Sequence, residues 1–243
     1  MAQNLYDDPE FFAGYSRLGR SIDGLEGAAE WPALRALLPA MRGLRVVDLG
    51  CGFGWFCRWA RAEGAAQVLG IDVSEKMLER ARATTSDTAI VYRKADLDRL
   101  GLEPASFDLA YSSLALHYLA ELPALLATVH RALVPGGGRL VFSVEHPIFT
   151  APTRPGWSVA ADGGKAWSLD AYLIEGPRTT DWLKPGVVKQ HRTLATYLNL
   201  LIAAGFTITD VEEWGPNDAQ IAARPSLADE RQRPPFLLVG ARR

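Results

Sequence analysis

The sequence has few cysteines and little net charge. Cys51 and Cys57 are its only two cysteines, and 26 Lys and Arg residues nearly balance 28 Asp and Glu residues. So few cysteines exclude a disulfide scaffold, and with four scattered histidines they form no metal-ligand cluster. A net charge of −2 gives no basic footprint for a nucleic-acid backbone. We therefore expect no metal, no nucleic-acid partner, and a reducing, cytoplasmic environment.

Long apolar runs are also missing. No segment approaches the ~18 consecutive apolar residues that a membrane span needs. The N-terminus, MAQNLYDDPEFF, has early acidic residues and lacks the positively charged start of a secretory signal. With 48% hydrophobic and 22% charged residues, the 243 residues suit one globular domain with additions. The seven tryptophans are the unusual feature of the composition.

Strands and helices alternate through the middle of the chain. The predicted strands are residues 45–49, 66–71, 90–93, 107–112 and 139–144. The predicted helices are residues 55–63, 75–83 and 122–133, with Ser74 as the N-cap of the second. Such alternation predicts a doubly wound parallel sheet with right-handed crossovers, whose ligands bind at the carboxyl ends of the strands. A helix at 194–204 and strands at 207–211 and 236–239 follow.

Two segments lie outside this alternation. Residues 1–43 read as a cap of two amphipathic helices, at about 9–18 and 28–38, ahead of a main domain at 44–243. Residues 147–190 are rich in Pro, Gly and Trp and show no clear periodicity. A loop this long inside a compact domain is typical of a lid or a substrate-binding insertion.

The strongest local signal is the segment VVDLGCGFG, residues 46–54, in which a strand runs into a glycine-rich turn at the start of a helix. Glycines let the backbone approach a ligand, and the free N–H groups of a helix start favour anionic groups. The next strand ends at Asp72, where a carboxylate can accept hydrogen bonds from both hydroxyls of a ribose. The G-x-G-x-G spacing differs from the G-x-G-x-x-G of dinucleotide sites. Taken alone, each feature also suits a tight turn or a helix cap.

Five motifs in order give the chain a wider resemblance. VVDLGCGFG, GIDVSEKML, KADLDRL, FDLAYSSLALHYL and LVPGGGRLVFS, over about residues 44–146, resemble the motifs of class I S-adenosylmethionine-dependent methyltransferases. The resemblance implies a Rossmann-like, seven-stranded α/β sheet with an antiparallel final hairpin, and S-adenosylmethionine as cofactor.

The resemblance also implies a set of cofactor-binding residues. Asp72 would hold the ribose hydroxyls, Asp96 and Leu97 the adenine, and Ser112 would lie beside the methionine amine through its backbone. The full set is Asp48, Gly50, Cys51, Gly52, Gly54, Asp72, Val73, Met77, Asp96, Leu97 and Ser112.

Methyl transfer is an in-line displacement, so the protein must orient the acceptor, exclude water and accept any proton that the acceptor loses. His117 follows the fourth strand, and Glu145 and His146 follow the fifth. Histidine can accept a proton near neutral pH, although a histidine after a strand often only bonds backbone groups. Tyr6 offers an aromatic wall with a hydroxyl, in a segment that family members commonly fold over the cofactor. We therefore predict His117, Tyr6 and His146 as catalytic residues.

Aromatic residues gather in the two additions. Trp31 lies in the cap and Trp157, Trp167 and Trp182 in the insertion, where they suit a flat ligand or else attach the lid to the core. The predicted substrate-binding residues are Tyr6, Phe11, His117, Glu145, His146, Trp182 and His191.

The expected function is N- or O-methylation of a small heteroaromatic metabolite, with azapteridines of the toxoflavin type as the example, in a monomer or homodimer. Two alternatives remain open at this point. One is a quinone-pathway C- or O-methyltransferase, and the other is a non-catalytic cofactor-binding module.

Overall fold

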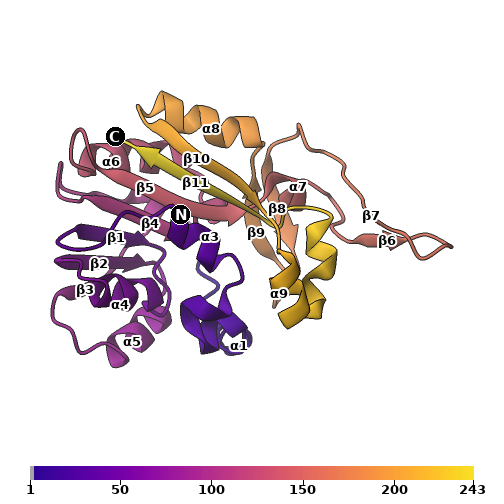
Figure 1. The fold of residues 1–243 in the computed structure, drawn as a ribbon, viewed down its shortest axis with the longest axis horizontal. Coiled ribbons are helices and arrows are strands. Elements are labelled where there is room, and N and C mark those ends of the chain that lie inside the picture. The colour runs from indigo at the N-terminus through magenta and orange to yellow at the C-terminus, as the bar shows by residue number, and fades with distance from the viewer. Residues whose placement is uncertain (1–2) are drawn as a thin grey trace.

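A computed structural model of the chain describes residues 3–243 and contains a seven-stranded mixed sheet in the order β10-β11-β5-β4-β1-β2-β3. The first five strands are parallel, whereas β11 runs antiparallel to both β5 and β10 (Figure 1). This confirms the predicted fold class. The strands are β1 (Arg45–Leu49), β2 (Gln67–Asp72), β3 (Ile90–Lys94), β4 (Leu109–Ser113), β5 (Arg139–Glu145), β10 (Thr207–Trp214) and β11 (Phe236–Arg242).

Helices cover both faces of this sheet, as a doubly wound fold requires. Because side chains alternate along a strand, Val46 of β1 packs into one buried cluster and Val47 into the other. The first cluster includes residues of α3, α4 and α5, and the second includes residues of α6 and α8. The helices are α3 (Trp31–Ala36), α4 (Trp55–Ala62), α5 (Glu75–Ala83), α6 (Leu122–Ala132) and α8 (Leu194–Ala203).

The N-terminal cap differs from the prediction of two longer helices. It consists of α1 (Pro9–Tyr15), α2 (Gly19–Ile22), the 3₁₀ turn η1 (Gly24–Gly27) and the short α3. The chain folds back on itself between α2 and η1, where a Cβ at Gly27 would clash with the backbone of Gly19. This close approach lies between the two predicted helices, so the segment that joins them is a compact turn made of α2 and η1.

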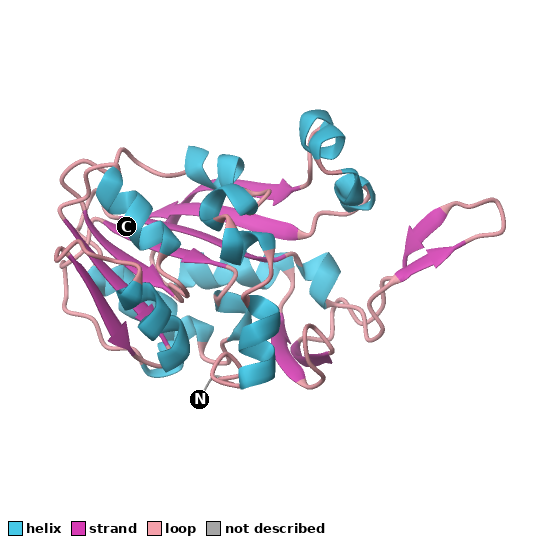
Figure 2. Ribbon diagram, turned by 90° about the horizontal axis from the view of Figure 1, so that it is seen from below, coloured by secondary structure: helices cyan, strands magenta, loops and turns pink. Residues whose placement is uncertain are grey.

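The insertion after β5 contains regular structure that its sequence did not reveal. It comprises α7 (Pro147–Thr150), the hairpin of β6 (Trp157–Val159) and β7 (Lys165–Trp167), and the hairpin of β8 (Gly176–Thr180) and β9 (Val187–His191). The β6–β7 hairpin projects away from the body of the molecule, whereas β8–β9 lies beside the sheet (Figure 1, Figure 2).

The final two strands form the expected antiparallel pair, but no tight turn joins them. Residues 215–235 between them include α9 (Asp218–Ala223) and the 3₁₀ segment η4 (Pro225–Arg231). Arg233 follows this segment, and its guanidinium lies 4.0 Å from the ring centre of Trp167 and 5.3 Å from that of Trp157. These two tryptophans therefore attach the projecting hairpin to the body.

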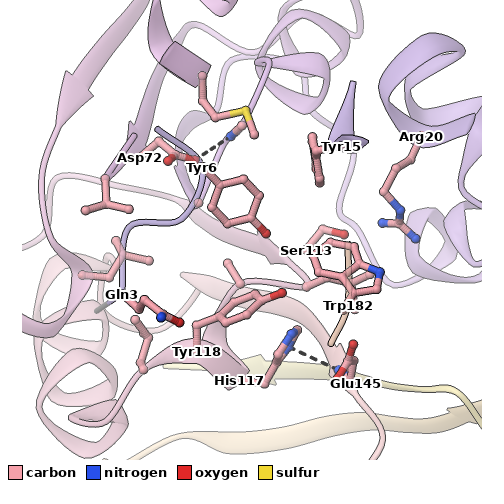
Figure 3. Close-up of a pocket in the computed structure, with 18 residues that line it drawn as sticks. Gln3, Tyr6, Tyr15, Arg20, Asp72, Ser113, His117, Tyr118, Glu145 and Trp182 are labelled. Atoms are coloured by element: carbon pink, nitrogen blue, oxygen red, sulfur yellow. Dashed lines mark hydrogen bonds between the residues drawn. The ribbon is translucent and has the colours of Figure 1, made fainter. Parts of the chain in front are cut away.

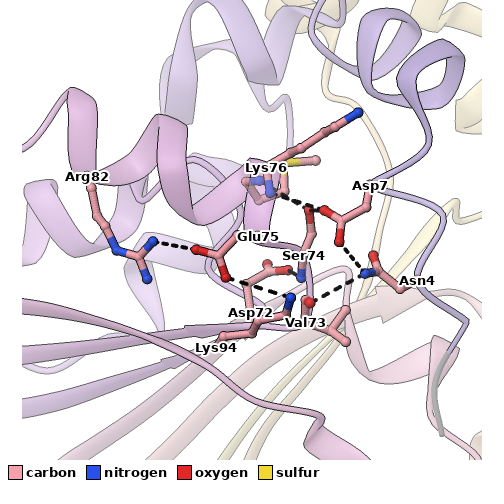
Figure 4. A network of polar contacts seen from close by, with 10 residues as sticks. Asn4, Asp7, Asp72, Val73, Ser74, Glu75, Lys76, Arg82 and Lys94 are labelled. Carbon is pink, nitrogen blue, oxygen red and sulfur yellow. Dashed lines mark hydrogen bonds and ion pairs between the residues drawn. The ribbon is translucent and has the colours of Figure 1, made fainter.

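Residues 3–8, here called the N-terminal strap, connect the sheet to the β8–β9 hairpin. Asp7 Oδ1 accepts hydrogen bonds from Ser74 Oγ at 2.6 Å and from the Lys76 backbone N–H at 3.1 Å, at the start of α5 (Figure 4). At the other side, Gln3 donates to the Gly186 carbonyl and accepts from the Val188 N–H, both at 3.0 Å. The strap therefore joins the segment that follows β2 to the β8–β9 hairpin.

We expect Asp7→Ala to lower the free energy of unfolding by about 1 kcal/mol, because the start of α5 loses an acceptor for its N–H and hydroxyl donors. Although burial alone would raise it, hydrogen bonds from Ser74 and Lys76 hold the pKa of Asp7 below its ordinary value. Its stabilisation is therefore present at neutral pH and is lost as the pH falls through that lowered pKa. Urea unfolding at neutral and acidic pH measures both effects. Asp23→Ala, an exposed acidic position in the cap, is the control, and an equal loss in both variants would contradict the prediction.

Candidate active site

A cavity of about 940 Å³, counting its open mouth, lies at the carboxyl ends of the parallel strands, beneath the strap and beside the β8–β9 hairpin (Figure 3). We call it the first cavity. Elements far apart in sequence contribute to it: the glycine turn, the loop after β4, the end of β5, the cap and the insertion. The predicted residues that line it are Tyr6, Gly50, Gly52, Asp72, Val73, Met77, Leu97, His117, Glu145 and Trp182.

Asp72 holds the glycine turn in place. Its Oδ2 accepts a hydrogen bond from the Gly52 N–H at 2.8 Å, and its Oδ1 accepts one from the Ser74 N–H at 2.9 Å. Gly50, at φ +83°, has no room for a side chain, because a Cβ there would meet that of Ala115. Burial raises the pKa of Asp72. Each carboxylate oxygen keeps a lone pair that can accept a further hydrogen bond from a ligand hydroxyl in the cavity.

Other predicted cofactor residues support the turn from outside the first cavity. Ser112 Oγ donates to the Leu49 carbonyl at 2.7 Å and joins β4 to β1, so that Ser113 is the serine that faces the cavity. Gly54 starts α4 at φ +71° and packs against Tyr92. Ser112 and Gly54 therefore contribute to the shape of the glycine turn.

Asp96 has one oxygen in use and one free. Its Oδ1 accepts from the Asp98 N–H at 3.0 Å and so caps the 3₁₀ turn η2 (Leu97–Arg99). Its Oδ2 is buried and has no hydrogen-bond partner within residues 3–243. A buried acceptor of this kind calls for a donor such as an amino group.

Asp48 and Cys51 line a neighbouring cavity of about 630 Å³, the inner cavity, on the other side of the glycine turn. Burial raises the pKa of the Asp48 carboxyl to about 7, although Cys57 Sγ donates a hydrogen bond to its Oδ2 at 3.3 Å. Arg20 lines both cavities and pairs with buried Glu30 at 3.0 Å.

Arg20 was not predicted from the sequence. It lies in the short helix α2, which the fold-back at Gly27 packs against η1. An arginine there can offer its remaining N–H donors to a carboxylate.

Aromatic side chains form the walls of the first cavity near its mouth. The ring of Tyr6 lies edge-on to those of Tyr15 and Tyr118, with centroids 5.3 and 6.4 Å apart. Burial raises the pKa of Tyr6 well above its ordinary value, so that the phenol is neutral at physiological pH. Phe11 lies behind this wall, 1% exposed, and packs against Tyr6 and Trp182 without lining the cavity.

The polar end of the first cavity is built from His117 and Glu145. The backbone N–H of Glu145 donates to His117 Nδ1 at 3.3 Å (Figure 3). Burial, together with the positive charges of Lys189, Arg192 and Arg20, lowers the pKa of His117 well below its ordinary value. This bond assigns the neutral tautomer whose Nε2 carries the proton, so His117 presents an N–H donor to the first cavity.

Glu145, unlike His117, has an atom that can accept a hydrogen bond from a ligand. Its Oε1 pairs with the Nζ of buried Lys189 at 2.5 Å. Its Oε2 is buried and, in the part of the chain that the structure describes, accepts no hydrogen bond. Lys189 was not predicted from the sequence, because the insertion gave no periodic pattern from which to identify its buried positions.

The structure places two of the predicted histidines elsewhere. His146 Nδ1 accepts from the Ile148 N–H and caps α7, and its Nε2 lies 2.8 Å from Glu213 Oε1. His191 Nδ1 and Nε2 each lie 2.9 Å from a partner, Thr150 Oγ1 and the Tyr172 carbonyl oxygen respectively. With both ring nitrogens in use, these histidines support the insertion, and neither lines the first cavity.

Within residues 3–243, no group of three or more His, Cys, Asp or Glu side chains is arranged to hold a metal ion. Over the same residues, no helix is both long enough and apolar enough to cross a membrane.

Comparison with known proteins agrees with this geometry. A family model described as a methyltransferase domain matches residues 47–142. The fold superposes with TM-score 0.88 on an S-adenosylmethionine-dependent methyltransferase from Mesorhizobium loti, 65% identical, over 90% of this chain and 100% of that one. A second structure, from Listeria monocytogenes and assigned to the same cofactor class, is 40% identical over 88% of this chain and 97% of that one, with TM-score 0.79.

A shorter match joins the chain to a malonyl-[acyl-carrier protein] O-methyltransferase from Erwinia pyrifoliae. The two are 42% identical over 100 residues, which is 41% of this chain and 37% of that protein. The structural relatives cover far more of the molecule and carry the assignment. The chain belongs to the S-adenosylmethionine-dependent methyltransferases and is an enzyme that uses this cofactor.

Proposed function

We propose that the enzyme transfers a methyl group to a nitrogen or oxygen atom of a small, flat, heteroaromatic acceptor bound in the first cavity. The observation that carries this proposal is the pairing of aromatic walls, from Tyr6, Tyr118 and Trp182, with a single polar end at His117 and Glu145. A site with these properties orients a planar ring and leaves one polar edge for recognition.

The residues around the glycine turn fit the cofactor. Each Asp72 oxygen accepts one backbone hydrogen bond and keeps a lone pair for a ribose hydroxyl. Asp96 Oδ2, which has no partner within residues 3–243, suits the exocyclic amine of adenine. Arg20 and Asp48 face the inner cavity, where they can bind the carboxylate and the ammonium of the methionine part. When bound, S-adenosylmethionine supplies an electrophilic methyl group on a sulfonium sulfur.

Glu145 and His117 make different polar interactions with the methyl acceptor. Glu145 Oε2 accepts the hydrogen bond, and then the proton, from an N–H or O–H of the acceptor. Lys189 holds the other oxygen of Glu145, Oε1, in an ion pair and so fixes the position of the carboxylate. His117 donates a hydrogen bond to an acceptor lone pair on the same edge of the ring, and the strap with Trp182 restricts access of water.

Known relatives do not fix the acceptor. The name of the Erwinia relative gives it a malonyl-[acyl-carrier protein] acceptor, but that match spans 41% of this chain. The azapteridine example, the quinone-pathway alternative and the choice between monomer and homodimer therefore remain predictions. The proposal depends on the shape and polarity of the first cavity alone.

We expect Asp48→Asn to stabilise the protein above pH 7 and to weaken cofactor binding. The native carboxyl holds its proton up to about pH 7, whereas the unfolded one releases it near its ordinary value, 3.8. Native stability therefore falls as the pH rises between these values, by up to about 4 kcal/mol for a shift of this size. Thermal unfolding near pH 6 and near pH 8 measures the effect.

In the Asp48→Asn variant this pH dependence should flatten, and affinity for S-adenosylhomocysteine should drop because the ammonium loses its carboxylate. Asp210→Asn, on exposed β10, is the control. Unchanged pH dependence in the cavity variant would show that Asp48 does not titrate near neutrality.

The acceptor proposal is tested with a methyl-labelled cofactor and a pool of small metabolites, read by mass spectrometry. We expect the wild-type enzyme to label a planar N–H or O–H compound. Glu145→Gln should reduce this labelling by about 100-fold or more, because the amide cannot accept the proton. Affinity for S-adenosylhomocysteine, followed by tryptophan fluorescence, should stay unchanged.

Glu103→Gln, at an exposed loop position, is the matched control and should keep full activity. Labelling of an aliphatic compound without a ring would overturn the proposed acceptor class. Full activity of Glu145→Gln would remove Glu145 as the proton acceptor.

A further inference from the structure

A third cavity, of about 870 Å³, lies behind the polar end of the first one. We call it the rear cavity. Apart from Glu145 at the end of β5, all of its lining comes from residues 149–189 of the insertion. Glu145 lines both the first and the rear cavity, so the two spaces meet at this side chain.

The ion pair of Glu145 and Lys189 forms the boundary between the two spaces. Lys189 lines the rear cavity and is 3% exposed, and its Nζ lies 2.5 Å from Glu145 Oε1. The same ammonium lies 5.3 Å from the ring centre of Trp182, which lines the first cavity. A molecule that passes Glu145 would therefore leave the aromatic walls and meet the ammonium of Lys189.

The rear cavity has an excess of positive charge. Its charged lining residues, within the part of the chain described here, are Glu145, Lys189 and Arg178, which sum to a formal charge of +1. Arg178 already donates to backbone carbonyls, among them those of Ala151 and Ala171. Within residues 3–243, the three N–H groups of Lys189 have one hydrogen-bond partner, Glu145 Oε1.

The remaining lining is apolar or hydroxylated. Phe149, Pro152 and Ile174 offer apolar surface, and threonines supply hydroxyl groups. A buried ammonium with donors to spare, surrounded by apolar side chains, suits a short carbon chain that ends in an anionic group.

We propose that the rear cavity binds a side chain of the acceptor that ends in a carboxylate, with Lys189 as its partner. The acceptor then has two parts, a flat ring in the first cavity and a short acidic tail that passes Glu145. This inference rests on the proposed function and adds to it the second half of the substrate. It also assigns the insertion a role in choosing the acceptor.

Three probes that differ only in their tails test the inference. They are indole, indole-3-butyrate and the alcohol with the same four-carbon chain, each titrated into protein saturated with S-adenosylhomocysteine. We expect the butyrate to bind about tenfold more tightly than the alcohol, because the Lys189 ammonium forms an ion pair with a carboxylate but only a hydrogen bond with a neutral hydroxyl. The alcohol in turn should bind more tightly than indole, because its chain is buried.

Two substitutions separate the contributions of space and charge. Thr180→Phe places a ring in the rear cavity from β8 and should remove the advantage of both tails while leaving indole binding unchanged. Lys189→Gln keeps a donor for Glu145 but removes the charge, so it should abolish only the difference between butyrate and alcohol. Gln190→Phe adds the same bulk on β9 at a position outside the rear cavity and should retain the wild-type order.

Equal affinities for the three probes would overturn the inference, as would a butyrate advantage that survives in both Thr180→Phe and Lys189→Gln. Failure of the proposed function looks different, since no planar compound of the metabolite pool would then gain a methyl group. A wild-type enzyme that labels a planar compound but binds all three probes equally would keep the proposed function and lose the rear-cavity inference. Melting curves of the variants establish that each is folded.

Discussion

The arrangement of the site depends on one carboxylate, that of Asp72. By accepting hydrogen bonds from the N–H groups of Gly52 and Ser74, it joins the glycine turn after β1 to the start of α5. Ser74 in turn donates to Asp7, so the strap is attached to the same point. The strap carries Tyr6 into the cavity mouth and reaches the β8–β9 hairpin through Gln3. The glycine turn, the aromatic wall and the insertion are therefore all connected to the end of β2 through these hydrogen bonds.

Local patterns in the sequence predicted the parts of the molecule that are determined locally. The five parallel strands, the cap at Ser74 and the position of Asp72 follow from apolar runs, a cap residue and a strand end, and all agree with the structure. The two helices predicted for the N-terminal segment form as α1 and α3 but are shorter, and the contact between Gly19 and Gly27 folds the chain back between them. Arg20 and Lys189 could not be predicted, because each reaches the cavities only through contacts made after the chain has folded.

For the histidines and tryptophans, the residue type alone did not determine the role of the side chain. Residue type suggested a catalytic role for His117 and His146 and a substrate contact for His191, but what a histidine does is set by the partners of its two ring nitrogens. Those partners come from distant segments, such as Glu213 for His146. The tryptophans divide in a similar way: Trp182 lines the first cavity, whereas Trp157 and Trp167 surround Arg233 and hold a hairpin. The structure thus shows attachment of the insertion for Trp157 and Trp167. A ligand contact of Trp182 stays a prediction.

The buried ion pair between Glu145 and Lys189 is better explained by function than by stability. Removing two charges from water costs several kcal/mol per ion, and their attraction seldom returns more than that. An apolar pair of similar volume would fill the same space at lower cost. Among residues 3–243, the pair leaves Glu145 Oε2 without a partner on one side and Lys189 with donors to spare on the other. The ion pair lies where the first and rear cavities meet, with a hydrogen-bond acceptor on Glu145 and N–H donors on Lys189 still available. This arrangement suits polar ligand groups in both cavities.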